Sequence, residues 1–228
     1  MFLIERVSKA LAYGISSTLN MDKEREEIIA YGAFAFIQTV WSILLVITFG
    51  IIFNVLVQAL VISLSISLLR KYSGGAHSSS PNRCALIGAV ISTLLGILVN
   101  TAVSFMDFYQ IALAGIISFA LSYFIVSKLA PVDSAAKPIK KAETRRRLKR
   151  KSLCMLNLLF LAAAVLNALY YIYDIQIVLA CALCIYIGVI WQAFTLTKTG
   201  HLMLGAIDEL FRKAFLFMGR EKNGKKIY

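Results

Sequence analysis

The chain has 228 residues, of which 59% are hydrophobic and only 16% are charged, and its formal net charge is +12. This composition excludes an ordinary soluble domain, which mixes polar and apolar residues throughout, and indicates a protein that resides in lipid. Basic segments beside anionic lipid explain the positive charge, so we expect membrane lipids and no nucleic acid among its partners.

The first predicted element is an amphipathic helix within residues 1–27. Apolar residues recur there at helical spacing, including Val7, Leu11 and Ile15. This pattern is typical of a helix that lies on a membrane surface or packs against a helix bundle. The segment lacks the charged start, short apolar run and cleavage site of a signal peptide, so we expect the first span to be an uncleaved anchor.

Long stretches without Asp, Glu, Lys or Arg predict the membrane spans. About 20 apolar residues in a helix cross the bilayer core, because a helix rises about 1.5 Å per residue. The first such stretch, 28–69, is long enough for two spans, and Gly50 and Asn54 near its middle provide a turn. The predicted fold class is all-α, a polytopic integral membrane protein with about six transmembrane helices in three hairpins. The predicted helices cover residues 29–49, 52–69, 85–104, 108–127, 153–172 and 175–197.

We expect a single membrane domain over residues 1–228. Its predicted parts are an interfacial N-terminal helix at 1–27, a transmembrane bundle at 28–197 with long loops at 70–84 and 128–151, and a cytoplasmic tail at 198–228. The tail repeats the amphipathic pattern, because Leu204, Ile207 and Phe211 recur at helical spacing. It is therefore expected to form a second interfacial helix.

The basic residues predict the orientation of the spans. All 24 Lys and Arg fall in segments on one side of the membrane if both termini are inside. Cytoplasmic segments near spans retain such residues, whereas short translocated loops do not. The predicted outer turns carry Asp107 and Asp174 and nothing basic. We therefore expect a multi-pass protein of the cell membrane with loop 70–84 at the cytoplasmic face.

Two further features concern packing and partners. Gly88, Ser92 and Gly96 form a small face on the third span that lets another helix approach closely, which permits a homodimer without requiring one. The basic loop 128–151 has two interpretations, as a topology determinant that faces anionic lipid or as a clamp for an acidic peptide. Pro131 in its first half discourages a helix there.

Loop 70–84 holds the residues most suited to chemistry. Ser80 suits a helix N-cap and Pro81 the first helical position, so Cys84 falls in the first turn of the third span. A helix N-terminus carries partial positive charge, and Arg83 adds a full charge nearby. We therefore expect Cys84 to favour its thiolate form, which is the nucleophile.

His77 can meet Cys84 only if the loop folds back. Gly74 and Gly75 make that reversal possible, and their N–H groups could approach a substrate carbonyl as an oxyanion hole. On the residues alone, a Cys and a His seven positions apart are a weak indication of catalysis. A capped loop with an incidental thiol is the alternative. Two ligands leave metal coordination incomplete, so we expect no metal.

The remaining cysteines and the second histidine have simpler interpretations. Cys154, Cys181 and Cys184 fall inside spans, and we interpret all three as buried small apolar residues. His201 lies in the tail and is interpreted as exposed and incidental.

The loop resembles the signature of the accessory gene regulator B (AgrB) family, bacterial membrane endopeptidases of peptide quorum sensing. The resemblance lies in Arg70, the sequence Gly74-Gly75-Ala76-His77, and Cys84. It extends to Tyr31-Gly32 near the first span and to Pro131-Val132-Asp133 and Lys137-Pro138 in the basic loop.

The resemblance implies a cysteine-type endopeptidase without a cofactor, in which His77 and Cys84 are the catalytic pair. The implied substrate is a short AgrD-like propeptide with an amphipathic N-terminal part and an acidic C-terminal tail. In the family, a side chain of the propeptide captures the thioester to give a cyclic thiolactone or lactone. The candidate substrate-binding residues are Arg70, Gly74, Gly75, Lys137, Lys140 and Lys141.

A third catalytic residue is not evident, because loop 70–84 contains no Asp or Glu. Family members often have an acidic residue just after the Tyr-Gly pair, where this chain has Phe34. Glu24, Glu26 and Glu27 are possible substitutes, and a dyad without a third member is equally consistent.

Two other functions stay open at this point: a small membrane transporter or exporter of a peptide or lipid-like substrate, and a structural subunit. Coupled transporters usually carry an ionisable residue within a span, and none of the predicted spans contains one. A structural subunit predicts that Cys84 is chemically ordinary. The sequence therefore favours the peptidase.

Overall fold

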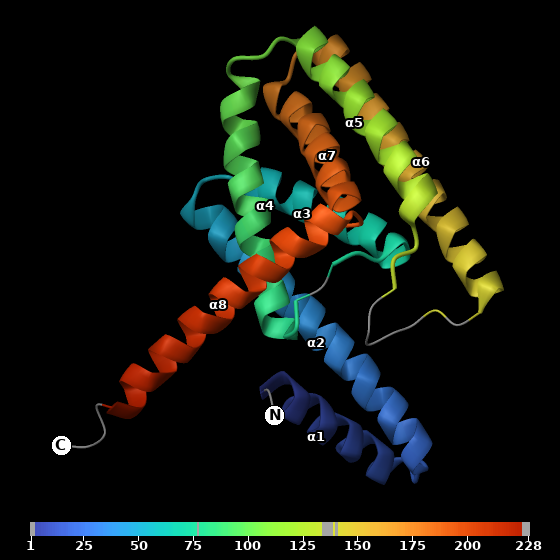
Figure 1. The fold of residues 1–228 in the computed structure, drawn as a ribbon, viewed down its shortest axis with the longest axis vertical. Helices are drawn as coiled ribbons and strands as arrows, with labels where there is room; N and C mark the ends of the chain where they lie inside the picture. Colours follow the sequence, from blue (N-terminus) through green and yellow to red (C-terminus); the bar gives the residue numbers. More distant parts are fainter. Residues whose placement is uncertain (1–2, 77, 134–138, 140, 225–228) are drawn as a thin grey trace. The chain divides into compact units, whose positions relative to one another are not determined.

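The computed structural model describes residues 3–76, 78–133, 139 and 141–224. This part of the chain forms eight helices (Figure 1). They are α1 (Leu3–Thr18), α2 (Lys23–Ile52), α3 (Leu56–Ser73), α4 (Pro81–Val103), α5 (Phe108–Leu129), α6 (Ala142–Tyr173), α7 (Gln176–Phe194) and α8 (Lys198–Gly224). Helices α2 to α7 are each long and apolar enough to cross a membrane. The prediction of a polytopic all-α membrane protein with six spans is confirmed.

Two spans begin well before their predicted starts. Helix α2 starts at Lys23 and α6 at Ala142, so both include charged residues outside the apolar stretch. Lys, Arg and Glu are good helix formers, and the helix therefore continues beyond the segment that lipid requires to be apolar. The basic run from Arg145 to Lys151 is consequently helical.

The chain divides into two compact units, residues 1–45 and 46–228. In the first unit, one face of α1 is buried and consists of Ser8, Ala12 and Ser16. The Ser16 hydroxyl donates to Glu26 Oε2 over 3.0 Å. The apolar stripe of α1 expected from its spacing, Val7, Leu11 and Ile15, is exposed. Its docking on a membrane surface stays a prediction.

In the second unit, α3, α4, α5 and α6 all contact α7, which is the most buried span (Figure 1). Glycines allow this close packing. A Cβ at Gly115 of α5 would collide with the ring of Tyr186, and one at Gly188 of α7 would lie 2.8 Å from Ser65 Cβ. The position of α7 matters for the site, because its last turn supports the loop after α3.

The connections after α4 and after α6 lie at one end of this unit (Figure 1). Asp107 caps α5 by accepting from Gln110 N over 2.9 Å, and Asp174 ends α6 with a positive φ of 51°. The predicted turn between the first two spans is also confirmed, since Val55 N donates to Gly50 O over 2.8 Å and Asn54 has a φ of 55°.

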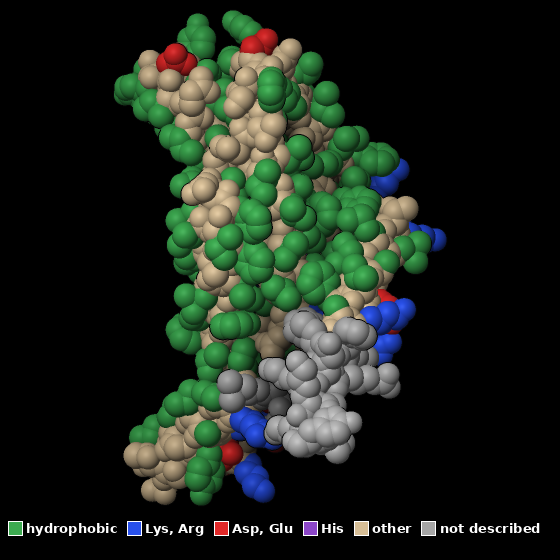
Figure 2. All heavy atoms as spheres, turned by 90° about the vertical axis from the view of Figure 1, so that its left-hand side faces the viewer, with side chains coloured by type: hydrophobic (Ala, Val, Ile, Leu, Met, Phe, Trp, Pro, Cys, Tyr) green, Lys and Arg blue, Asp and Glu red, His purple; other side chains and the backbone are tan. Residues whose placement is uncertain are grey.

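The small face of α4 is used only in part. A Cβ at Gly96 would lie 3.3 Å from Ala59 N of α3, so this glycine brings the two helices together. Gly88 is exposed and has open space around its Cα. Hydrophobic side chains cover much of the visible surface, as expected for contact with lipid (Figure 2). The small face therefore still permits a homodimer without requiring one.

Candidate active site

The loop after α3 begins with two glycines in conformations that other residues rarely adopt. Gly74 has a φ of +71° and Gly75 a φ of +126°. Gly74 N donates to Arg70 O over 3.0 Å and thereby ends α3. The Arg70 side chain reaches forward over this turn and donates from Nη2 to the Ala76 carbonyl oxygen. The sequence Arg70 to Ala76 therefore forms a closed turn.

This Gly-Gly turn docks between α7 and the segment after α5. Gln192 of α7 donates from Nε2 to Gly74 O over 2.8 Å and to Ser73 Oγ over 3.1 Å. On the other side, Val132 N donates to Ser73 O over 2.9 Å. A Cβ at Gly74 would collide with the Val132 carbonyl oxygen. Glycine is thus required here by backbone conformation and by space.

The backbone N–H groups of the turn differ in their hydrogen bonding. The Gly74 N–H bonds to Arg70 O, and the Ala76 N–H bonds to Thr195 O over 3.2 Å. Within the described part of the chain, the Gly75 N–H has no hydrogen-bond partner. Because the peptide is planar and trans, the bond to Gly74 O directs the Gly75 N–H away from Gln192. Gly75, which is buried, is therefore the glycine of the pair whose N–H is not bonded to another described residue.

Cys84 lies where the sequence predicts. Ser80 has extended φ and ψ angles of −132° and 133°, and Pro81 is the first residue of α4. Cys84 N donates to Ser80 O over 2.9 Å, so the cysteine occupies the first turn of the helix. Its side chain is half-buried. The Ser80 hydroxyl makes no capping bond within the described residues.

The charge around Cys84 involves two arginines. Arg83, which the sequence suggested as the charge acting on the thiol, forms an ion pair with Asp208 of α8, 2.8 Å from Nε to Oδ1. The Arg70 guanidinium also interacts electrostatically with Cys84. Arg70 thus closes the Gly-Gly turn and also interacts with the cysteine.

Asp208 is a site residue that sequence reasoning missed. Partial burial raises the pKa of its carboxyl, but hydrogen bonds from Arg83, Ser78 and Ser79 outweigh this and hold the pKa well below its usual range. A local signal for its role exists, since Asp208 lies four residues after Leu204 and three before Phe211, on the apolar face of the tail helix. A carboxylate on such a face usually has a partner.

The basic loop meets the Gly-Gly turn through its Pro131-Val132-Asp133 sequence. The Val132 contact brings together two motifs that lie far apart in the chain. Asp133 accepts from Arg145 Nη2 at 2.8 and 2.9 Å, which fixes the start of α6. Lys141 is exposed immediately before α6. Lys137 and Lys140 lie outside the described residues.

His77 also lies outside the described residues, so its predicted meeting with Cys84 stays a prediction. The interpretation of the other cysteines is wrong for Cys154, which is exposed, whereas Cys184 is buried and Cys181 partly so. An exposed thiol on a span fits a lipid-facing surface. His201 is exposed, as expected, with Nδ1 2.9 Å from Thr197 O.

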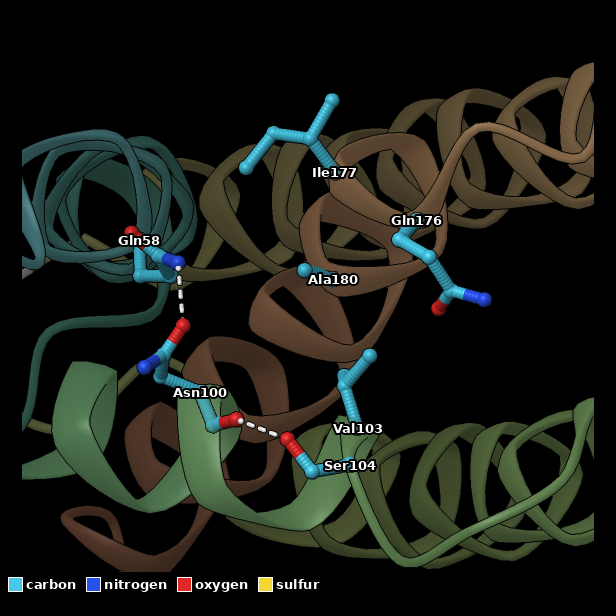
Figure 3. Close-up of a pocket in the computed structure, with 7 residues that line it drawn as sticks. All are labelled: Gln58, Asn100, Val103, Ser104, Gln176, Ile177 and Ala180. Atoms are coloured by element: carbon cyan, nitrogen blue, oxygen red, sulfur yellow. Dashed lines mark hydrogen bonds between the residues drawn. The ribbon is translucent and has the colours of Figure 1, made fainter.

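A polar cavity of about 420 Å³ lies at the other end of the bundle (Figure 3). Gln58 of α3 donates to Asn100 Oδ1 of α4 over 3.2 Å at its edge. Its lining is formed by Gln58, Asn100, Val103, Ser104, Gln176, Ile177 and Ala180. None of these side chains ionises near neutral pH, so acid–base or nucleophilic chemistry is not supported there. No three described His, Cys, Asp or Glu side chains form a metal site either.

Together these features define a class of protein: a multi-pass helical membrane protein with a half-buried cysteine at the start of a span, beside an arginine and a Gly-Gly turn. The family model of accessory gene regulator B matches residues 8–196. The chain belongs to the accessory gene regulator B family, which is linked to peptide processing in quorum sensing.

Individual relatives are similar along nearly the whole chain. AgrB-like proteins of Clostridium perfringens strains SM101 and 13 are 43% and 42% identical over 212 residues, which is 92% of this chain and 99% of each relative. An AgrB-like protein of Halalkalibacterium halodurans is 26% identical over 168 residues, covering 72% of this chain and 79% of that protein. No solved structure matches the chain.

Proposed function

We propose that the protein is a cysteine endopeptidase that removes the acidic C-terminal tail of a membrane-associated, AgrD-like propeptide. The observation that carries this proposal is the setting of Cys84. It is half-buried in the first turn of α4, within electrostatic reach of the Arg70 guanidinium. A helix N-terminus and a nearby cation both stabilise a thiolate relative to a thiol, and the thiolate is the attacking species.

In the proposed reaction, His77 accepts the thiol proton and Cys84 Sγ attacks the scissile carbonyl carbon. The C–N bond then breaks, and the acidic tail leaves as an amine that takes the proton from His77. A thiol or hydroxyl of the bound propeptide next attacks the thioester, closes a cyclic thiolactone or lactone, and returns its proton to the Cys84 thiolate. The thioester retains the energy of the cleaved bond, so ring closure requires only that water is kept away.

Gly75 is the proposed oxyanion donor. Its N–H has no partner among the described residues, while those of Gly74 and Ala76 already bond to protein carbonyls. An oxyanion hole needs N–H groups that are held in place and still unbonded before the reaction. Gln192 supplies the first requirement by holding the Gly74 carbonyl.

The basic start of α6 is the proposed binding surface for the acidic tail. Lys141, Arg146, Arg147 and Arg150 are exposed there, while Arg145 is engaged with Asp133. Clustered Lys and Arg side chains attract an acidic peptide through long-range charge as well as contact. Lys137 and Lys140 extend the same run in sequence.

The test is cleavage of a candidate propeptide, co-expressed with the protein and followed by mass spectrometry. Cys84→Ala and His77→Ala are each expected to abolish cleavage, because they remove the nucleophile and the base. Cys154→Ala is the matched control, since Cys154 is an exposed cysteine of a span and is not part of loop 70–84, and should cleave normally. Cleavage that persists in both Cys84→Ala and His77→Ala would refute the peptidase proposal.

The proposed orientation has its own test. Cys84 should react with a membrane-impermeant maleimide in inverted vesicles and stay protected in intact cells, because loop 70–84 is proposed to face the cytoplasm. Labelling in intact cells alone would overturn the orientation. The label is assigned to Cys84 by peptide mass spectrometry, which separates it from the three cysteines in the spans.

A further inference from the structure

The carboxylate of Asp208 accepts hydrogen bonds from several residues of the segment between the Gly-Gly turn and Cys84. Asp208 Oδ1 accepts from the Ser78 hydroxyl and from Arg83 Nε, the latter over 2.8 Å. Its Oδ2 accepts from Ser79 N over 3.1 Å and from Ser79 Oγ over 2.7 Å. Arg83 Nη2 closes the group by donating to Ser79 Oγ over 2.6 Å. Four of these five contacts have Asp208 as their acceptor.

The group is partly shielded from water. The side chain of Asp208 is 13% exposed and that of Arg83 is 19% exposed. Charged hydrogen bonds are stronger in such a setting, and losing one partner leaves the other charge without compensation. Helix α8 also packs against α4 near this group, so Asp208 is presented from a separate element.

The contacts of Asp208 lie at both ends of the segment between the proposed catalytic residues. Ser78 directly follows His77 in the chain, and Arg83 directly precedes Cys84. A change in either contact therefore shifts a residue that is covalently joined to a proposed catalytic group. Asp208 also pairs with Arg83, the residue next to Cys84 in the chain.

We propose that Asp208 of α8 is a positioning residue, which holds the segment from Ser78 to Arg83 in the shape that peptide cleavage requires. The inference rests on the proposed function. It goes beyond the family pattern, because the family model matches residues 8–196 and ends before Asp208. In this proposal helix α8 positions residues of the active site, in addition to any contact with the membrane.

The experiment uses the full chain in lipid vesicles with a candidate propeptide, and measures kcat and KM. Asp208→Ala is expected to lower kcat about 10- to 100-fold with KM nearly unchanged, because small displacements of reacting groups are costly and Asp208 acts through other residues. Asp208→Asn retains one acceptor oxygen and should lose less. Glu209→Gln is the matched control, since Glu209 pairs with Arg212 and Lys213 inside α8, and should behave as wild type.

A second readout is independent of cleavage: the alkylation rate of Cys84 by iodoacetamide, followed by peptide mass spectrometry. Asp208→Ala should change this rate at least about threefold, and Glu209→Gln should not. If Asp208→Ala does not accumulate as folded protein, two other variants test the proposal: Asp208→Asn and the double exchange of Arg83→Asp with Asp208→Arg. The double exchange is expected to recover part of the kcat that is lost when Asp208 alone is changed.

The outcomes separate the two proposals. Wild-type kcat in the Asp208 variants, or a raised KM with unchanged kcat, overturns the positioning role while cleavage by the wild type still supports the peptidase. Cleavage of the propeptide that persists in both Cys84→Ala and His77→Ala overturns the peptidase proposal itself. In that case an unchanged alkylation rate in Asp208→Ala would overturn the positioning role as well.

Discussion

Replacing Gly74 with alanine should loosen the docked turn without touching the proposed catalytic groups. The φ and ψ angles of Gly74, 71° and −145°, lie close to a region that is essentially reserved for glycine, at a cost of about 1–3 kcal/mol for other residues. The new Cβ would also collide with the Val132 carbonyl oxygen. Moving the segment that contains Val132 away breaks the bond from Val132 N to Ser73 O, which adds about 1 kcal/mol.

The sum of about 2–4 kcal/mol predicts at least about a 30-fold fall in the docking equilibrium constant, since about 1.4 kcal/mol is a factor of ten. Hydrogen exchange measured by mass spectrometry checks this at the Val132 amide, which should exchange faster by that factor in Gly74→Ala. Gly88→Ala is the control, because a Cβ there meets nothing within 4 Å. Unchanged Val132 protection in Gly74→Ala would refute the reasoning.

Three further predictions concern other parts of the molecule. The pKa of Asp208 is depressed below its ordinary 3.8, so its contribution to stability is complete above that pH and is lost as the pH falls from 3.8 toward the lower folded-state value. Melting curves between about pH 7 and about pH 2 should show a smaller acid loss in Asp208→Asn than in wild type. Gln192→Leu removes the two hydrogen bonds that Gln192 Nε2 donates to Ser73 and Gly74, and it should weaken the docking of the Gly-Gly turn by about 1–3 kcal/mol. The change is measurable as faster hydrogen exchange at the Ala76 amide. Gly115→Ala overpacks the ring of Tyr186 and should cost about 1–3 kcal/mol, seen as a lower melting temperature in detergent; an unchanged value in any of the three contradicts the contact concerned.

The spans could be predicted from sequence because lipid imposes a local rule. Every residue in the bilayer core must be apolar or internally bonded, so an uncharged stretch such as 108–127 coincides with helix α5 almost to its ends. The same rule says nothing about a helix once it leaves the lipid. That is why the start of α6 at Ala142 was missed, although the helix-forming Lys and Arg that follow it were visible.

The position of Cys84 was also predictable, because N-cap and proline preferences act within a few residues. The ion-pair partner of the neighbouring Arg83 could not be predicted in this way. Arg83 is adjacent to Cys84 in sequence but pairs with Asp208 of α8, and Arg70, fourteen positions before Cys84, also interacts electrostatically with the cysteine. Proximity along the chain is a poor guide to charge pairing, since it depends on which way a side chain faces.

The sequence by itself determined the membrane class, the spans and the cysteine at a helix start, since each depends on hydropathy or on local backbone preferences. Only the tertiary structure decided how the site is held together. Gln192 supports the Gly-Gly turn from α7, and Asp208 supports the following segment from α8, at separations of more than 100 residues in the chain. Such contacts form when helices pack, and no short stretch of sequence encodes them.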